Sequence, residues 1–352
     1  MDSVTQAALG AGIAGALMGP RYGRKAILAG AALATLPDLD ILIKYGDPLS
    51  QMINHRGFSH SLFVLTAFAL FLGWLAKRFR LHKDGQGYGR LLLTIWLILI
   101  THPVLDAFTS YGTQLWWPLR PTPSSWSSVF IIDPFYTAPL LGGVLIALLV
   151  GPRAAMSRAL GAILLLGAGY LGASLAAKHW AENRVHDMLV EQGRQPVAMF
   201  SVPQPFNIVL WRVVARMEDG NYVEAITGML DNRQPEFIEF PSNAELGLAL
   251  QPQKYIDGLR WFTGDWLRYD DIDGQLVVSD LRMGIGTGHY SFRFLIGERD
   301  PDSGQWQAVT PAHWQGGPAS RDMAALKTTL ARIWQTGSPL PLAAWNVRMT
   351  MP

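Results

Sequence analysis

Long apolar runs separated by short polar segments dominate the first half of the chain. Six of them approach the length of a membrane helix: residues 4–19, 25–43, 58–76, 91–109, 136–152 and 159–178. A bilayer core of about 30 Å requires roughly 20 helical residues, with 17–25 the usual range. The pattern predicts an α-helical multi-pass membrane domain of about six spans over residues 1–178. The first run is rich in glycine and alanine, so an interfacial or re-entrant helix is the alternative there.

The pattern changes over residues 179–352, where short alternating strands are separated by turn residues. Asp-Gly pairs between two such strands are typical of β-hairpins. We therefore predict a soluble α+β domain with a mainly antiparallel sheet. Its expected elements are a helix over Lys178–Gln192, a hairpin of Val209–Met217 with Tyr222–Leu230, a second of Trp266–Asp271 with Gln275–Met283, a third of Tyr290–Gly297 with Trp306–Val309, and an amphipathic helix over Ala319–Gln335.

Charge supports the same division. Charged residues make up only 16% of the 352 residues, against roughly 25% in ordinary soluble proteins. Residues 1–178 contain 14 Lys and Arg, 7 Asp and no Glu, a net charge of +7. Residues 179–352 contain 15 Lys and Arg against 20 Asp and Glu, a net charge of −5. The chain has no cysteine, which excludes disulfides and thiolate metal sites.

Basic residues lie mainly in alternate loops between the apolar runs, and such loops are cytoplasmic as a rule. This predicts a multi-pass protein of the cytoplasmic (inner) membrane with both termini, and residues 179–352, on the non-cytoplasmic side. The loops predicted to be cytoplasmic contain Arg21, Arg24, Lys25, Lys77, Arg78, Arg80, Lys83, Arg90, Arg153 and Arg158, and the opposite loops contain only Lys44, Arg56 and Arg120.

In this topology the polar residues near the apolar runs gather at the outer ends of the spans. They occur at Asp2 and Gln6, in Pro37-Asp38-Leu39-Asp40, in His55-Arg56-Gly57-Phe58-Ser59-His60-Ser61, in His102–Asp106 and at Asp133. Ionisable side chains near hydrocarbon are costly and usually functional. Because they fall on one side, we expect them to share one site.

The residue types and their spacing suit a divalent metal ion. His102 and Asp106 are four apart, so they share one helix face; a buried His–Asp hydrogen bond is the alternative for this pair. His55 and His60 flank a glycine-containing turn that allows both imidazoles to approach one point. Asp38 and Asp40 face different ways on a helix, so one of them can ligate while the other orients a histidine.

We assign Asp40, His55, His60, His102 and Asp106 as metal ligands, and Asp38 and Arg56 as catalytic residues. Arg56 is suited to binding phosphate or to stabilising an oxyanion, with headgroup anchoring as its alternative. Histidine and aspartate together favour zinc first, with manganese or iron as alternatives. Such an ion lowers the pKa of its bound water towards about 7 and polarises a substrate oxygen.

The ordered set of motifs resembles the YdjM-type family of predicted membrane-bound metal-dependent hydrolases. It comprises Met1-Asp2-Ser3-Val4-Thr5-Gln6 together with the four fragments above, and it covers about residues 1–178. The resemblance implies an inner-membrane, metal-dependent hydrolase with His and Asp ligands, at His55, His60, His102 and Asp106 with Asp38 or Asp40.

The leading hypothesis is a hydrolase in which a metal-activated water attacks an ester or phosphoester, with a lipid at the outer face as a candidate substrate. The expected partners are membrane lipid and a small-molecule or lipid substrate, and no nucleic acid. An ion-binding or transport protein is one alternative, although transport sites lie near the bilayer midplane. A structural or partner-binding membrane protein with an inactive site is another. A serine hydrolase using Ser59 or Ser61 is the remaining enzyme alternative.

Overall fold

The computed structural model describes residues 1–80, 87–314 and 319–350. Two compact units emerge. The first consists of residues 1–44, 55–126 and 131–173, and the second of residues 45–54, 127–130 and 174–352. The basic residue Lys83, predicted to lie in a cytoplasmic loop, falls outside the described residues.

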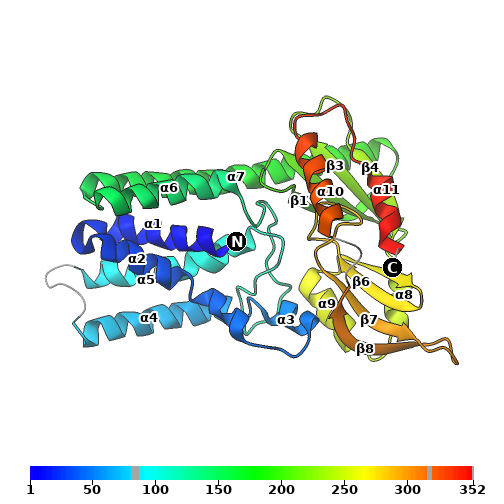
Figure 1. Ribbon diagram of the computed structural model, residues 1–352, viewed down its shortest axis with the longest axis horizontal. Helices are drawn as coiled ribbons and strands as arrows, with labels where there is room; N and C mark the ends of the chain where they lie inside the picture. Colours follow the sequence, from blue (N-terminus) through cyan, green and yellow to red (C-terminus); the bar gives the residue numbers. More distant parts are fainter. Residues whose placement is uncertain (81–86, 315–318, 351–352) are drawn as a thin grey trace. The chain divides into compact units, whose positions relative to one another are not determined.

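The first unit is a bundle of helices that lie side by side (Figure 1). Its α-helices are α1 (Ser3–Tyr22), α2 (Arg24–Ala34), α4 (Leu62–Arg78), α5 (Tyr88–Ala107), α6 (Pro134–Val150) and the first part of α7 (Ala154–Glu191). Two short 3₁₀ helices, η1 (Pro37–Leu42) and η2 (Phe58–His60), interrupt the connections. This confirms the helical N-terminal half that the apolar runs predict.

Six membrane spans are not supported, which corrects the sequence prediction. By length and apolar composition, two described helices are able to cross a membrane, α5 and α7, and a third span arises if Pro48–His60 and Leu62–Arg78, bent by 45°, form one unit. Helix α2 has 11 residues, so it is only about 16 Å long. Helix α6, with 17 residues, is at the lower limit. Apolar runs of near-membrane length thus include short helices that pack within the bundle.

Helices α1 and α2 cross with their backbones in contact. A Cβ atom on Gly10 would lie 2.4 Å from the carbonyl oxygen of Gly30, and one on Gly30 would lie 2.4 Å from that of Gly10. Only glycine permits this approach, which is the usual role of small residues in membrane helix pairs. The crossing fixes the position of α2, and therefore of Ala34 at its C-terminal end.

Basic residues gather at one end of this bundle. The Arg24 guanidinium donates to the carbonyl of Leu149, at the end of α6 (2.7 Å), and the Lys77 ammonium lies over the ring of Tyr88, at the start of α5. Arg21 lies beside Gly87. Three segments that are remote in sequence therefore share one basic end, and the predicted membrane topology stays a prediction.

The second unit contains two antiparallel four-stranded sheets with strand orders β1-β2-β3-β4 and β5-β6-β7-β8. The first sheet comprises β1 (Pro196–Pro203), β2 (Leu210–Met217), β3 (Asn221–Gly228) and β4 (Glu236–Pro241), and the second β5 (Leu267–Ile272), β6 (Gln275–Asp280), β7 (Arg293–Arg299) and β8 (Trp306–His313). The helices are α3 (Pro48–Asn54), α8 (Ala244–Ala249), α9 (Lys254–Thr263), α10 (Ala319–Arg332), α11 (Leu342–Asn346) and the 3₁₀ helix η3 (Val347–Thr350), with the second part of α7.

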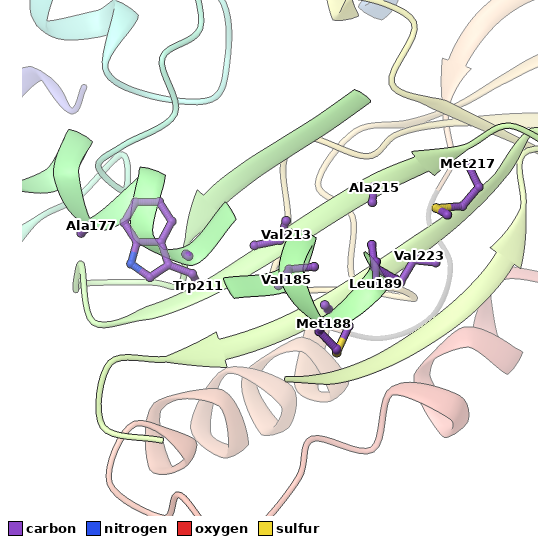
Figure 2. Close-up of a cluster of buried hydrophobic side chains, with 11 residues drawn as sticks. Ala177, Val185, Met188, Leu189, Trp211, Val213, Ala215, Met217 and Val223 are labelled. Carbon is purple, nitrogen blue, oxygen red and sulfur yellow. The ribbon is translucent and has the colours of Figure 1, made fainter. Parts of the chain in front are cut away.

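Alternation along β2 explains the core of this unit. Val213 and Ala215 contact the apolar face of α7, where Val185 and Leu189 lie (Figure 2). Val214, between them, points to the opposite face and joins a second buried cluster. Because successive strand residues point to opposite faces, a strand covered on both sides is apolar throughout.

The three predicted hairpins are present. Strand β2 pairs with β3, β5 with β6, and β7 with β8, all antiparallel. Asp273 and Gly274 at the second turn both have positive φ, 52° and 78°, as a type I′ turn requires. The antiparallel C-terminal domain is thus confirmed, with two sheets.

Candidate metal centre

Four side chains from three elements converge within the first unit, at the end of α5 opposite to the basic residues. Asp38 lies on η1, His60 on η2, and His102 and Asp106 lie one turn apart on α5. Each offers one ligand atom, and these atoms all lie within 4.8 Å of one another. Three of the side chains are fully buried, and that of Asp38 is 21% exposed.

Local sequence explains the position of each element. Pro37 lacks an N–H donor, so α2 ends shortly before it and the chain tightens into η1. Arg56, before η2, has a φ of 61°, which is uncommon for a residue with a side chain. Its N–H donates to Asp40 Oδ2 (2.9 Å), which holds the turn in this conformation. On α5, Pro103 follows His102 directly and leaves the carbonyl of Leu99 without its helical donor.

Five of the six distances between the ligand atoms are close to those of a tetrahedral site, and the sixth, between the two carboxylates, is within 4.8 Å. His60 Nε2 lies 3.5 Å from Asp38 Oδ1, 3.3 Å from Asp106 Oδ2 and 3.2 Å from His102 Nε2. His102 Nε2 lies 3.3 Å from Asp38 Oδ1 and 3.7 Å from Asp106 Oδ2. Ligand bonds of about 2.0–2.2 Å in a tetrahedral zinc site place neighbouring ligand atoms roughly 3.3–3.6 Å apart. The four side chains therefore already have the spacing of a first coordination shell.

The tautomer of His102 is fixed by the end of α2. His102 Nδ1 lies 2.7 Å from the carbonyl oxygen of Ala34. A carbonyl only accepts, so Nδ1 carries the proton. In the neutral ring, Nε2 then directs a lone pair at the centre of the group. Backbone carbonyls orient metal-binding histidines in this way.

The tautomer of His60 is fixed by a chain of hydrogen bonds. The Ser59 hydroxyl donates to Asp40 Oδ2 (2.6 Å), so its single proton is used. In the hydrogen bond of 2.9 Å between Ser59 Oγ and His60 Nδ1, the imidazole N–H must therefore be the donor. Nε2 of neutral His60 also directs a lone pair inward.

The centre of the group is consequently surrounded by acceptors. Two imidazole lone pairs and two carboxylate oxygens face one another, and buried Asp106 Oδ2 accepts no hydrogen bond among the described residues, although Arg56 Nε forms an ion pair with it at 3.2 Å. Buried acceptors without donors are strongly unfavourable. A cation satisfies all four at once, so the residues present fit a divalent metal ion.

Asp106 is held by three groups besides the histidines. The Gln6 amide donates to Asp106 Oδ1 (3.0 Å), and the amino group of Met1 forms an ion pair with the same oxygen. Arg56 Nε lies 3.2 Å from Oδ2. These contacts fix the carboxylate in the direction of the group.

Arg56 is buried beside the centre. Its guanidinium lies 5.0 Å from the ring centroid of Tyr111 and donates to the Thr109 hydroxyl (3.4 Å). The ring contact is a cation–π interaction. The structure thus places the predicted catalytic arginine next to a ligand carboxylate, within the same polar core.

Asp40 and His55 form a pair adjacent to the four-residue group and are not members of it. His55 Nδ1 donates to Asp40 Oδ1 (2.8 Å), and the His55 ring centroid is 6.1 Å from that of His60. Burial raises the pKa of Asp40, but hydrogen bonds from His55 and Ser59 outweigh it, so the pKa lies below its ordinary value. The predicted metal-ligand roles of Asp40 and His55 stay predictions, and Asp38, predicted as catalytic, lies among the potential ligands.

Other polar residues at this end have structural roles. Asp2 and Asp133 are the N-caps of α1 and α6. Ser61 caps α4 and donates to the carbonyl of Trp117 (2.6 Å). The carbonyl of Ala34 was not foreseen from the sequence, since every residue carries one and none is marked by its side chain.

The helical unit and its cluster define a class: a membrane protein with a buried His/Asp group suited to a divalent cation. The family model described as YdjM inner membrane protein matches residues 1–181. The chain belongs to this family, as its motifs predict, and all members of the cluster fall within the matched region.

Two bacterial proteins are similar to the chain. The uncharacterized protein YfhP of Bacillus subtilis (strain 168) is 25% identical over 235 residues, which cover 63% of this chain and 67% of YfhP. The inner membrane protein YbcI of Escherichia coli (strain K12) is 34% identical over 113 residues, 31% of this chain and 59% of YbcI. No solved structure matches the chain.

Proposed function

We propose that this protein is a membrane-bound metal-dependent hydrolase that cleaves an ester or phosphoester, and that Asp38, His60, His102 and Asp106 hold the ion. The observation that carries the proposal is the convergence of two imidazole lone pairs and two carboxylate oxygens within 4.8 Å of one another. Zinc fits these distances and donors, and manganese or iron share the donor preference. When bound, such an ion supplies Lewis acidity and lowers the pKa of a coordinated water.

The residues around the ligands supply the remaining chemistry. Asp40 orients His55 through Nδ1, which leaves Nε2 to take up or deliver a proton, as in other carboxylate-oriented histidines. The His55 side chain is 20% exposed, so a substrate can reach it. Arg56 provides a fixed positive charge for a developing phosphate or oxyanion.

The surroundings of Asp38 support a lipid substrate. Asp38 is the one member of the group with solvent exposure, so access to the centre runs past it. Its neighbours Leu39, Ile41 and Leu42 are 52%, 65% and 74% exposed. An exposed apolar segment of this kind suits contact with a bilayer. A substrate entering beside it is then a lipid with its polar group at the ion.

A second candidate is a structural ion site without catalysis. Four protein ligands complete a tetrahedron, and structural zinc sites are closed in this way, whereas catalytic sites keep an open position. The partial exposure of Asp38 favours catalysis, because an ion that expands its coordination gains its additional ligand on that side.

The first experiment measures metal content by mass spectrometry of the purified protein, for the wild type, His60→Ala and His102→Ala. We expect about one equivalent in the wild type and loss from both variants. His186→Ala is the matched control, because His186 lies on α7 outside the cluster. Full metal content in both cluster variants would show that the site is wrong.

The second experiment separates catalysis from a structural ion. Hydrolysis of a soluble phosphodiester and of phospholipid vesicles is followed for the wild type and His55→Ala. His55 lies outside the group, so we expect His55→Ala to retain metal while its kcat falls by about 100-fold or more. A wild type that binds metal but hydrolyses neither substrate, and whose Tm falls on chelation, would favour the structural candidate.

A further inference from the structure

The helical unit contains an apolar cleft that is separate from the metal centre. Its volume is about 710 Å³, and α1, α2, α4 and α5 provide its walls. Met18, Ala29, Leu72, Leu75 and Ile95 are typical of the lining. Thr94 also lines it, but its hydroxyl donates to the carbonyl of Arg90 within α5 (2.7 Å). The wall therefore offers hydrocarbon to an occupant over most of its length.

One end of the cleft is polar. Tyr22, the last residue of α1, and Lys25, the second residue of α2, complete the lining there. Within the part of the chain that the structure describes, the Lys25 ammonium has no ion-pair partner. This is also the basic end of the bundle, where Arg24 caps α6 and Lys77 lies over Tyr88. The polar end thus favours a negatively charged group.

The length of the cleft corresponds to one leaflet. Along α2 it extends from Lys25 to Leu33, about 12 Å at 1.5 Å per residue. Half of a bilayer core is about 15 Å. Along α5 it ends at Ile98, one turn before His102, so the metal centre lies beyond this end of the cleft.

We propose that this cleft binds one anionic phospholipid, with the phosphate at Lys25 and Tyr22 and an acyl chain along the apolar wall. The charge at one end and the hydrocarbon wall match the two parts of such a lipid. Water fills an apolar cavity poorly, and basic residues at a membrane surface attract anionic lipids. The site is independent of the proposed hydrolase activity.

The test is retention of lipid by the full-length protein. Protein is incubated with mixed phosphatidylglycerol and phosphatidylcholine vesicles, solubilised in mild detergent and examined by native mass spectrometry. We expect one retained phosphatidylglycerol per wild-type chain. Lys25→Ala removes the charge and should lower retention by about fivefold. Ala29→Trp fills the cleft and should abolish retention.

Matched controls use the same substitutions elsewhere. Ala32→Trp lies on α2 outside the cleft lining, and Lys44→Ala removes a basic residue outside it; both should retain lipid like the wild type. If Ala29→Trp fails to fold, as judged by circular dichroism, Leu72→Trp fills the cleft from α4 instead. Unchanged retention in the filled variant, equal retention of phosphatidylcholine, or a dimer of the chain in place of lipid would overturn the proposal.

Discussion

The contact between Gly10 and Gly30 allows a test of how helix packing supports the metal centre. Replacement of Gly10 by alanine adds one methyl group at the α1–α2 crossing. Its Cβ would lie 2.4 Å from the Gly30 carbonyl oxygen and 2.4 Å from the Cβ of Ala34. Neither atom belongs to a flexible side chain, so the two helices have to separate, and we expect α2 to move.

The size of the movement follows from ordinary contact distances. Van der Waals contact begins at 3.4 Å, so α2 must shift by about 1 Å at the crossing. The hydrogen bond from His102 Nδ1 to the Ala34 carbonyl is 2.7 Å long, and the same shift would extend it to about 3.7 Å, beyond hydrogen-bonding range. Loss of such a supporting contact lowers metal affinity by roughly 10–100-fold.

Metal affinity is measured by competition with a chelating dye in detergent solution, alongside circular dichroism. We expect Gly10→Ala to retain its helical content and to bind the ion 10–100-fold more weakly. The matched control is Gly142→Ala on α6, where the added Cβ meets no atom within 4 Å. Wild-type affinity in Gly10→Ala, or an equal loss in Gly142→Ala, would refute the link between the crossing and the centre.

Three further predictions concern single side chains. Ser59→Ala removes the acceptor of His60 Nδ1 and should weaken metal binding about tenfold in the same dye assay; unchanged affinity would contradict the assigned tautomer. Arg332 binds Asp231 through two buried bonds of 2.8 and 2.7 Å, so Arg332→Met should cost about 3–5 kcal/mol of unfolding free energy. Burial raises the pKa of Asp231, but bonding to Arg332 outweighs it and leaves the pKa below its ordinary value. The pair's stabilisation is therefore full above about pH 3.9 and is lost as the pH falls further, a slope that Asp231→Asn should remove in denaturant titrations. Burial lowers the pKa of His289, so the folded state binds fewer protons than the unfolded state just below pH 6.5. Stability should thus fall as the pH drops below 6.5, and less so in His289→Gln; identical pH profiles would contradict this reasoning.

Part of the candidate site can be predicted from the spacing of residues that are close in sequence. His102 and Asp106 are four residues apart on a helix, which alone places them on one face, and the structure brings both into the group. The division between an apolar helical half and a polar half with hairpins also follows from periodicity. These signals depend on neighbours in sequence, so no tertiary information is needed to detect them.

Other features depend on contacts between remote segments. The roles of Asp38 and Asp40 cannot be separated by spacing, because the difference arises from His55 and Ser59, which approach Asp40 only in the folded chain. The predicted number of membrane spans is wrong for a similar reason. An apolar run is expected both for a helix buried in lipid and for a helix buried in protein. Helix α2 is apolar because it packs against α1 and α5.

All four potential ligands come from between residues 38 and 106. The candidate coordination shell is therefore encoded in a short, continuous part of the gene, and the two described β-sheets contribute none of its four side chains. The four potential ligands also lie within the matched residues 1–181, so substitutions after residue 181 do not remove any of these side chains.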